Sequence, residues 1–150
     1  MDWIILFIIS WTLFIFLVDW KKLKFNIWCG ILAILMQTAV DSQAISHKLY
    51  KINDLIISLW GSTIFFTLGP VFVIGTLLAQ FYPVKKWIKV ANIFIVSGLL
   101  SLQELFLIIR KDIIYINWHA IDSAVVNIGA VTLLSWFAIV ILNKGVSKKI

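Results

Sequence analysis

Five long apolar segments alternate with short polar connections along this chain of 150 residues. The segments cover residues 3–18, 25–40, 55–81, 88–109 and 121–142. A helix needs about 20 predominantly apolar residues to cross a bilayer, and a shorter segment can extend into its interfacial flanks. The pattern therefore predicts an all-α integral membrane helical bundle, a single domain over residues 1–150 with five transmembrane helices.

The third apolar segment contains the pair Gly69-Pro70. Proline removes a backbone donor and clashes with the preceding turn of a helix. We therefore predict a third helix that is kinked at Pro70. A re-entrant arrangement is the alternative, but the apolar residues on both sides of the pair favour a continuous, kinked helix.

The composition excludes several other classes of protein. Hydrophobic residues make up 62% of the chain and charged residues 13%, whereas soluble domains have about 45–50% apolar and about 25% charged residues. A chain this short cannot bury so many apolar side chains in a soluble core, and disordered chains contain few of them. Five spans with short connections leave no room for a separate soluble catalytic domain.

The basic residues are concentrated in alternate connections, which predicts an orientation. The side of a membrane protein that carries more lysine and arginine faces the cytoplasm. If the N-terminus lies outside and the C-terminus in the cytoplasm, the cytoplasmic side holds nine of the thirteen basic residues: Lys21, Lys22, Lys24, Lys85, Lys86, Lys89, Lys144, Lys148 and Lys149. We expect Lys21, Lys22, Lys24, Lys85, Lys86 and Lys89 to anchor the chain to anionic lipid at that face, and we expect no nucleic-acid partner.

Aromatic residues near the ends of the segments agree with this threading. Tryptophan and tyrosine are enriched at membrane–water interfaces, where their amphipathic rings match the headgroup region. We expect the outer interface to hold Trp3, Tyr50, Tyr115 and Trp118.

Glu104 is the only formal charge well inside an apolar segment. An acidic side chain at the centre of a membrane helix costs about 2.5–3.5 kcal/mol on insertion scales, so it should face the interior of the bundle. Ser97 and Ser101 lie seven and three residues before Glu104, on the same helical face. The other helices carry polar side chains at a similar depth: Gln37, Asp41, Ser58, Asp122 and Asn127. Ser123 shares a helical face with Asn127.

Two interpretations of these polar residues remain open. Polar side chains commonly hydrogen-bond between membrane helices without any further role. Alternatively, they line an outward-facing polar pocket that binds or transports a cation, a proton or a small polar solute. In this leading hypothesis the pocket is centred on Glu104 and its lining residues are Gln37, Asp41, Ser58, Ser101, Asp122 and Asn127.

Other functions have weaker support in the sequence. An accessory subunit of a larger membrane complex, or a homo-oligomer, is the alternative, with contact faces at the pairs Gly75/Ala79, Ser97/Ser101 and Ala120/Ala124. His119 and Asp122 have a spacing that permits a weak metal site, but no multi-ligand signature is present and we expect no metal or cofactor. No catalytic motif occurs, so we assign no catalytic residues and lean away from an enzyme.

Three short motifs lie in the C-terminal half: Phe81-Tyr82-Pro83, Leu102-Gln103-Glu104-Leu105 and Ile114-Tyr115-Ile116-Asn117-Trp118. In these motifs the chain resembles a family of small uncharacterised multi-spanning membrane proteins of endospore-forming Firmicutes. The resemblance implies four or five spans in a bacterial cytoplasmic membrane. It implies no activity.

Overall fold

A computed structural model describes residues 2–53 and 56–145, which are mostly helical. The predicted start of the third span at Leu55, together with Lys148 and Lys149, lies outside the described residues. In chain order the elements are α1 (Asp2–Leu17), α2 (Leu23–Ser46), β1 (Tyr50–Ile52), β2 (Ser58–Leu59), β3 (Ser62–Thr63), α3 (Ile64–Phe66), the π-helical turn η1 (Thr67–Val71), α4 (Phe72–Gln80), α5 (Lys86–Ile109), β4 (Ile113–Tyr115) and α6 (Ala120–Val140).

Three helices, α2, α5 and α6, are long and apolar enough to cross a membrane. The helix α1 and the helical stretch from Ile64 to Gln80 are also apolar, but they are shorter. The predicted membrane class therefore agrees with the length and composition of three helices.

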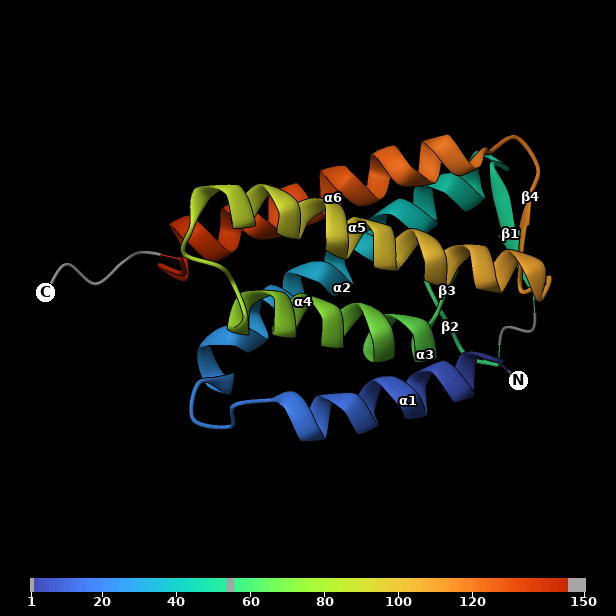
Figure 1. Ribbon diagram of the computed structural model, residues 1–150. Helices are drawn as coiled ribbons and strands as arrows, with labels where there is room; N and C mark the ends of the chain where they lie inside the picture. The colour runs from blue at the N-terminus through green and yellow to red at the C-terminus, as the bar shows by residue number, and fades with distance from the viewer. Residues whose placement is uncertain (1, 54–55, 146–150) are drawn as a thin grey trace, which may run out of the picture.

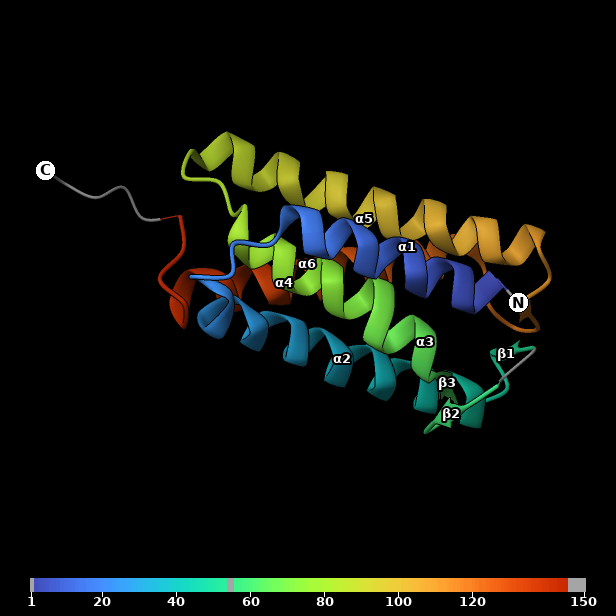
Figure 2. The same ribbon diagram turned by 90° about the horizontal axis from the view of Figure 1, so that it is seen from below.

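The helices lie side by side and run alternately in opposite directions between two ends of the bundle (Figures 1 and 2). All four strands lie at the end where α1 begins and α5 finishes, which we call the strand end. The connections α1–α2 and α4–α5 lie at the opposite end, together with the end of α6.

Small residues allow α2 and α4 to pack closely. A Cβ atom added at Gly75 of α4 would lie 2.7 Å from the Cβ of Ala33 and 3.0 Å from the carbonyl oxygen of Cys29. Such contacts are typical of membrane helices, whose association depends on close van der Waals packing. The helix α5 packs mainly against α6 and β4, and within it only Ser97 and Leu107 are buried.

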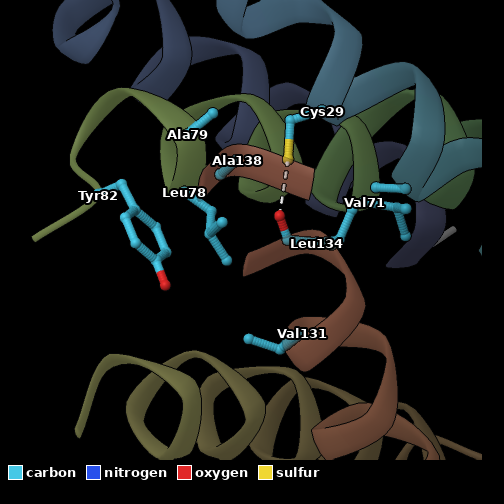
Figure 3. Close-up of a cluster of buried hydrophobic side chains, with 9 residues drawn as sticks. Cys29, Val71, Leu78, Ala79, Tyr82, Val131, Leu134 and Ala138 are labelled. Atoms are coloured by element: carbon cyan, nitrogen blue, oxygen red, sulfur yellow. Dashed lines mark hydrogen bonds between the residues drawn. The ribbon is translucent and has the colours of Figure 1, made fainter. Parts of the chain in front are cut away.

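The largest buried cluster joins α2, η1, α4 and α6 (Figure 3). Its thiol, Cys29 Sγ, lies 3.8 Å from the carbonyl oxygen of Leu134 and donates a weak hydrogen bond to it. The buried members are Cys29, Ala33, Val71, Leu78, Ala79, Tyr82, Val131, Leu134 and Ala138. This cluster holds α6 against the tightly packed pair α2 and α4.

The prediction for the third segment is wrong at its start, because the helix begins at Ile64. Residues 58–63 instead form the hairpin β2–β3, in which Ser58 pairs with Thr63. The turn contains Trp60 at φ 50° and Gly61 at φ 95°. Glycine adopts this left-handed backbone conformation without steric cost, so a hairpin interrupts a run that hydropathy alone assigns to a helix.

Pro70, where the sequence predicts a kink, lies in the π-helical turn η1. Gly69 in this turn has a non-helical backbone conformation, with φ −93° and ψ −105°. A Cβ atom at Gly69 would lie 3.1 Å from the Cα of Phe7, so glycine also permits α1 to approach. The indole N–H of Trp11 donates to the carbonyl of Leu68 in this turn at 3.1 Å.

The connection after the second segment is more ordered than the predicted loop. The helix α2 continues to Ser46 rather than ending near Val40, and β1 then pairs with β4 in an antiparallel ladder. In this ladder Tyr50 lies opposite Tyr115. The sequence pattern does not predict the ladder, which joins the connections that follow α2 and α5.

Candidate functional site

A cavity opens inside the bundle near the strand end. The space available to the centres of water molecules is about 60 Å³, several times the roughly 10–15 Å³ that a single water needs. Its lining side chains are Trp3, Gln37, Val40, Asp41, Tyr50, Ile52, Thr63, Phe66, Leu100, Glu104, Ile113, Trp118, Ser123, Val126 and Asn127. A few waters or a small polar group can therefore occupy it.

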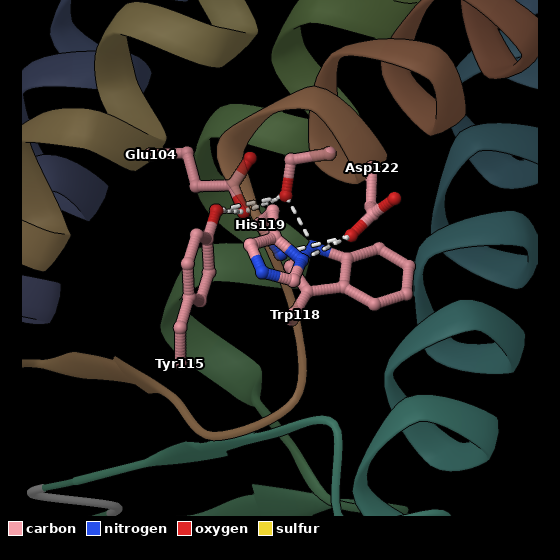
Figure 4. Close-up of polar contacts among 6 residues, drawn as sticks. Glu104, Tyr115, Trp118, His119 and Asp122 are labelled. Atoms are coloured by element: carbon pink, nitrogen blue, oxygen red, sulfur yellow. Dashed lines mark hydrogen bonds and ion pairs between the residues drawn. The ribbon is translucent and has the colours of Figure 1, made fainter.

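Glu104 projects from α5 into a network of donors at this cavity (Figure 4). Its Oε1 accepts hydrogen bonds from the hydroxyls of Tyr115 and Ser123, each at 2.7 Å. The indole N–H of Trp118 donates to Ser123 Oγ at 2.6 Å. Strand β4 and the first turn of α6 therefore converge on one oxygen of Glu104, and the turn after β4 joins them through Ser123.

Three oxygen atoms of this network form a closed triangle. Besides their contacts with Glu104 Oε1, Tyr115 Oη and Ser123 Oγ lie 2.8 Å from each other. Each hydroxyl supplies a single hydrogen, so two hydrogens serve three contacts when the carboxylate is ionised. One edge of the triangle is therefore left without a hydrogen of its own.

The second oxygen of Glu104 is more weakly engaged. The amide nitrogen of Asn127 lies 3.5 Å from Glu104 Oε2 and 3.2 Å from Ser101 Oγ. The longer of these distances exceeds the usual 2.7–3.2 Å range for an N–H···O bond. Glu104 Oε2 therefore remains available to a further donor.

Asp41 of α2 is the more deeply buried acid of the cavity, at 3% exposure. Its Oδ1 accepts hydrogen bonds from the Tyr50 hydroxyl and from Gln37 Nε2, the latter at 2.9 Å. Within the described residues its Oδ2 has no hydrogen-bond partner. The Ser62 hydroxyl faces this carboxylate but lies 3.0 Å from Thr67 Oγ1 and hydrogen-bonds there. A buried acceptor without a partner is costly, which favours a ligand that donates a hydrogen bond.

The two paired tyrosines connect the ladder to both carboxylates. Tyr50 donates to Asp41 of α2, and Tyr115 donates to Glu104 of α5. Burial raises the pKa of both phenols well above the ordinary value, and the neighbouring carboxylates raise it further. Both side chains therefore remain protonated donors at neutral pH.

The described lining of the cavity carries two acids and no lysine, arginine or histidine. The carboxylates of Asp41 and Glu104 are close enough to interact electrostatically. A cleft lined by charges of one sign concentrates ions of the opposite sign. The arrangement therefore favours a cation or a donor-rich solute over an anion.

The structure brings together most of the residues that the sequence singles out. Gln37, Asp41, Glu104 and Asn127 line the cavity, and Ser101 is one hydrogen bond away through Asn127.

Two predicted lining residues, Ser58 and Asp122, lie outside the cavity. Ser58 belongs to the β2–β3 hairpin, where its hydroxyl accepts the N–H of Gly61 at 3.2 Å. Asp122 Oδ2 accepts the backbone N–H of His119 at 2.9 Å and so caps the start of α6. In both cases local backbone groups, rather than the bundle interior, take up the polar side chain.

The weak metal alternative at His119 and Asp122 gains no further ligands. His119 Nδ1 lies 3.3 Å from Asp122 Oδ2, and the His119 side chain is largely exposed. In residues 2–53 and 56–145, no three or more histidine, cysteine or acidic side chains gather in a way that could hold a metal ion. The pair acts as part of a helix cap.

Tyr50, Tyr115 and Trp118 are the site residues that sequence reasoning missed. Their positions near segment ends predicted interface anchors, and the structure instead directs their polar atoms into the cavity network. The signal that could have found them is the pairing of β1 with β4, which joins residues far apart in the sequence.

Two of the three predicted small-residue contact faces are used inside the chain. Gly75 and Ala79 pack in the interior of the bundle, and Ser97 lies against α6, where its hydroxyl is 3.4 Å from the Asn127 carbonyl. Ala120 is exposed at the start of α6. The accessory-subunit alternative would therefore depend mainly on the pair Ala120/Ala124.

Comparison with known proteins adds no assignment: no protein-family model, curated protein or solved structure matches this chain. Function is therefore argued from the cavity itself.

Proposed function

We propose that this protein crosses the membrane five times and binds a small cationic solute in an outward-facing cavity, from which the solute is transported. The observation that carries the proposal is the pairing of Asp41 and Glu104 around one small cavity whose described lining has no basic residue. An ionised carboxylate away from bulk water needs a counter-charge, and a bound cation supplies it.

An ammonium group matches the hydrogen-bonding needs of the site. It carries donors only, and the open acceptors are Asp41 Oδ2 and Glu104 Oε2. The lining also contains the rings of Trp3 and Trp118. Tryptophan faces attract cations, so these rings add a further favourable surface for such a ligand.

The proposed threading places the cavity on the outer side. Lys21, Lys24 and Lys86 lie at the end opposite the strands, where the α1–α2 and α4–α5 connections also lie. At the same end Lys89 Nζ donates to the Gly145 carbonyl at 3.0 Å. Because the more basic end faces the cytoplasm, the strand end and its cavity face outward.

A binding measurement tests the proposal. The full chain is reconstituted in lipid nanodiscs and titrated with methylammonium chloride by calorimetry, with sodium chloride as the ionic-strength control. We expect Asp41→Asn and Glu104→Gln each to weaken binding at least tenfold, since a hydrogen bond to a charged group contributes about 1.5–3 kcal/mol.

Asp122→Asn is the matched control, because it neutralises an acid at the strand end outside the cavity. Its affinity for methylammonium should equal that of the unmodified chain. Absence of methylammonium binding, or equal binding by all variants, would overturn the proposal.

Transport is measured separately from binding. Proteoliposomes that contain the unmodified chain should take up radiolabelled methylammonium faster than protein-free liposomes, and Glu104→Gln should reduce this rate to the protein-free level. Binding without uptake would limit the function to solute binding.

A further inference from the structure

A second, mostly apolar space lies next to the cavity, on its side toward the opposite end of the bundle. It offers about 50 Å³ to the centres of water molecules. The two spaces share Gln37, Val40, Leu100, Val126 and Asn127, so they meet at a common boundary. Beyond that boundary the lining is entirely apolar: Ala33, Met36, Val71, Ile74, Gly75, Ala130, Val131 and Leu134.

We propose that the ligand is an organic amine with a short apolar substituent, whose ammonium group lies at Asp41 and Glu104 and whose substituent fills the apolar space. This inference rests on the proposed function and names its substrate class. Gln37 and Asn127 lie at the boundary. They separate the space that contains the carboxylates from one whose deeper lining has only apolar side chains.

The physical chemistry of the second space favours an apolar group over water. A water in a cavity needs two to four polar partners, and cavities lined by apolar side chains stay dry. A ligand that fills such a space gains the transfer free energy of each methylene, which corresponds to about fourfold tighter binding per CH₂. Each space is well below the roughly 150 Å³ cavity that holds benzene, so the substituent is limited to a few carbons.

A homologous series of amines tests the inference. Methyl-, ethyl-, propyl- and butylammonium are titrated against the full chain in nanodiscs, and empty nanodiscs measure partitioning into lipid. We expect the affinity to rise about fourfold with each carbon over the first additions and then to level off. Methylammonium binding with no gain along the series would overturn this inference and leave the proposed function intact. If none of the amines binds, the proposed function fails as well.

A variant that fills the apolar space gives the decisive comparison. Ala130→Leu adds three carbons to the lining of that space, so it should abolish the gain from longer substituents while methylammonium binds as before. Gly129→Leu is the matched control, because a side chain there meets open space on the neighbouring position of the same helix. Met36→Ala enlarges the space, so the affinity should stop rising only at a longer amine than in the unmodified chain. A gain that persists in Ala130→Leu and does not shift in Met36→Ala would place the substituent elsewhere and overturn the inference.

Discussion

Tyr50 and Tyr115 lie opposite each other across the β1–β4 ladder, and each donates its hydroxyl to a carboxylate on a different helix. Their protonated forms are favoured by burial and by the nearby acids, which raise the pKa of both phenols. A group whose folded pKa is raised stabilises the fold below its unfolded pKa and loses that contribution as pH rises toward the folded pKa. The relevant unfolded value for tyrosine is about 10.

We therefore predict that the stability of the protein declines as pH rises above about 10, in part through these two tyrosines. The unfolding midpoint in detergent, followed from pH 8 to pH 11, should fall less steeply in the double variant Tyr50→Phe/Tyr115→Phe. Lysines titrate in the same range, so Tyr82→Phe serves as the control, because it leaves both tyrosine–carboxylate contacts in place. Identical pH profiles for the double variant and the unmodified chain would contradict the prediction.

The hydroxyl of Ser123 contacts Tyr115, Trp118 and Glu104 together. We predict that Ser123→Ala lowers the free energy of unfolding by about 1–3 kcal/mol, because it leaves the Trp118 indole N–H without its acceptor. Thr132→Val is the control: the exposed Thr132 hydroxyl bonds only to the Ile128 carbonyl of its own helix, and the change should stay within about 0.5 kcal/mol. Chemical unfolding measures both variants, and an equal loss of unfolding free energy in Ser123→Ala and Thr132→Val would contradict the prediction.

At the residue scale, the sequence predicted the acids of the site but not the groups that hold them. Glu104 and Asn127 were found because a charge or an amide inside an apolar helix is conspicuous, and helical spacing identifies their shared faces. Tyr50 and Tyr115 are 65 positions apart and meet only through a strand pairing. No periodicity within one segment could have revealed that contact.

At the element scale, hydropathy located three of the helices well and failed where backbone conformation decides. Three observed helices, residues 2–17, 86–109 and 120–140, match the predicted segments to within two residues at each end. The helix after Ile64 does not, because Gly61 at φ 95° closes a hairpin within an apolar run. Hydrophobicity measures transfer into a membrane, whereas a turn depends on one residue's backbone freedom.

The α2–α4 contact gives a prediction at the same scale. Gly75→Ala should destabilise the protein by about 1–3 kcal/mol, because the new methyl group would lie 2.7 Å from Ala33 Cβ and 3.0 Å from a backbone oxygen. Gly98→Ala is the matched control on α5, since nothing lies within 4 Å of its added Cβ. That variant should be neutral or more stable, because alanine favours a helix over glycine. Thermal unfolding of both variants in one detergent measures the difference, and a neutral Gly75→Ala would show that the two helices can separate without cost.

At the scale of the whole molecule, an ion pair joins the first and fourth helical passes, α1 and α5, at the strand end. Arg110, just after α5, lies 2.8 Å and 3.3 Å from the two carboxylate oxygens of Asp2 at the start of α1. Because α5 packs mainly against α6 and β4, this pair adds a tie between the strand end of α5 and α1. Leu100 and Glu104 of α5 line the cavity, so α5 forms one wall of it.

The proposed function also requires the cavity to face outward, and this threading predicts a labelling pattern. Ser46→Cys places an exposed thiol at the strand end with little change in shape, and Lys21→Cys places one at the opposite end. In intact spheroplasts a membrane-impermeant maleimide should label Ser46→Cys at once and Lys21→Cys only after permeabilisation. The native Cys29 is fully buried and provides the unlabelled background. The reverse pattern would place the carboxylates of Asp41 and Glu104 on the cytoplasmic side, where the cavity would receive its solute from inside the cell.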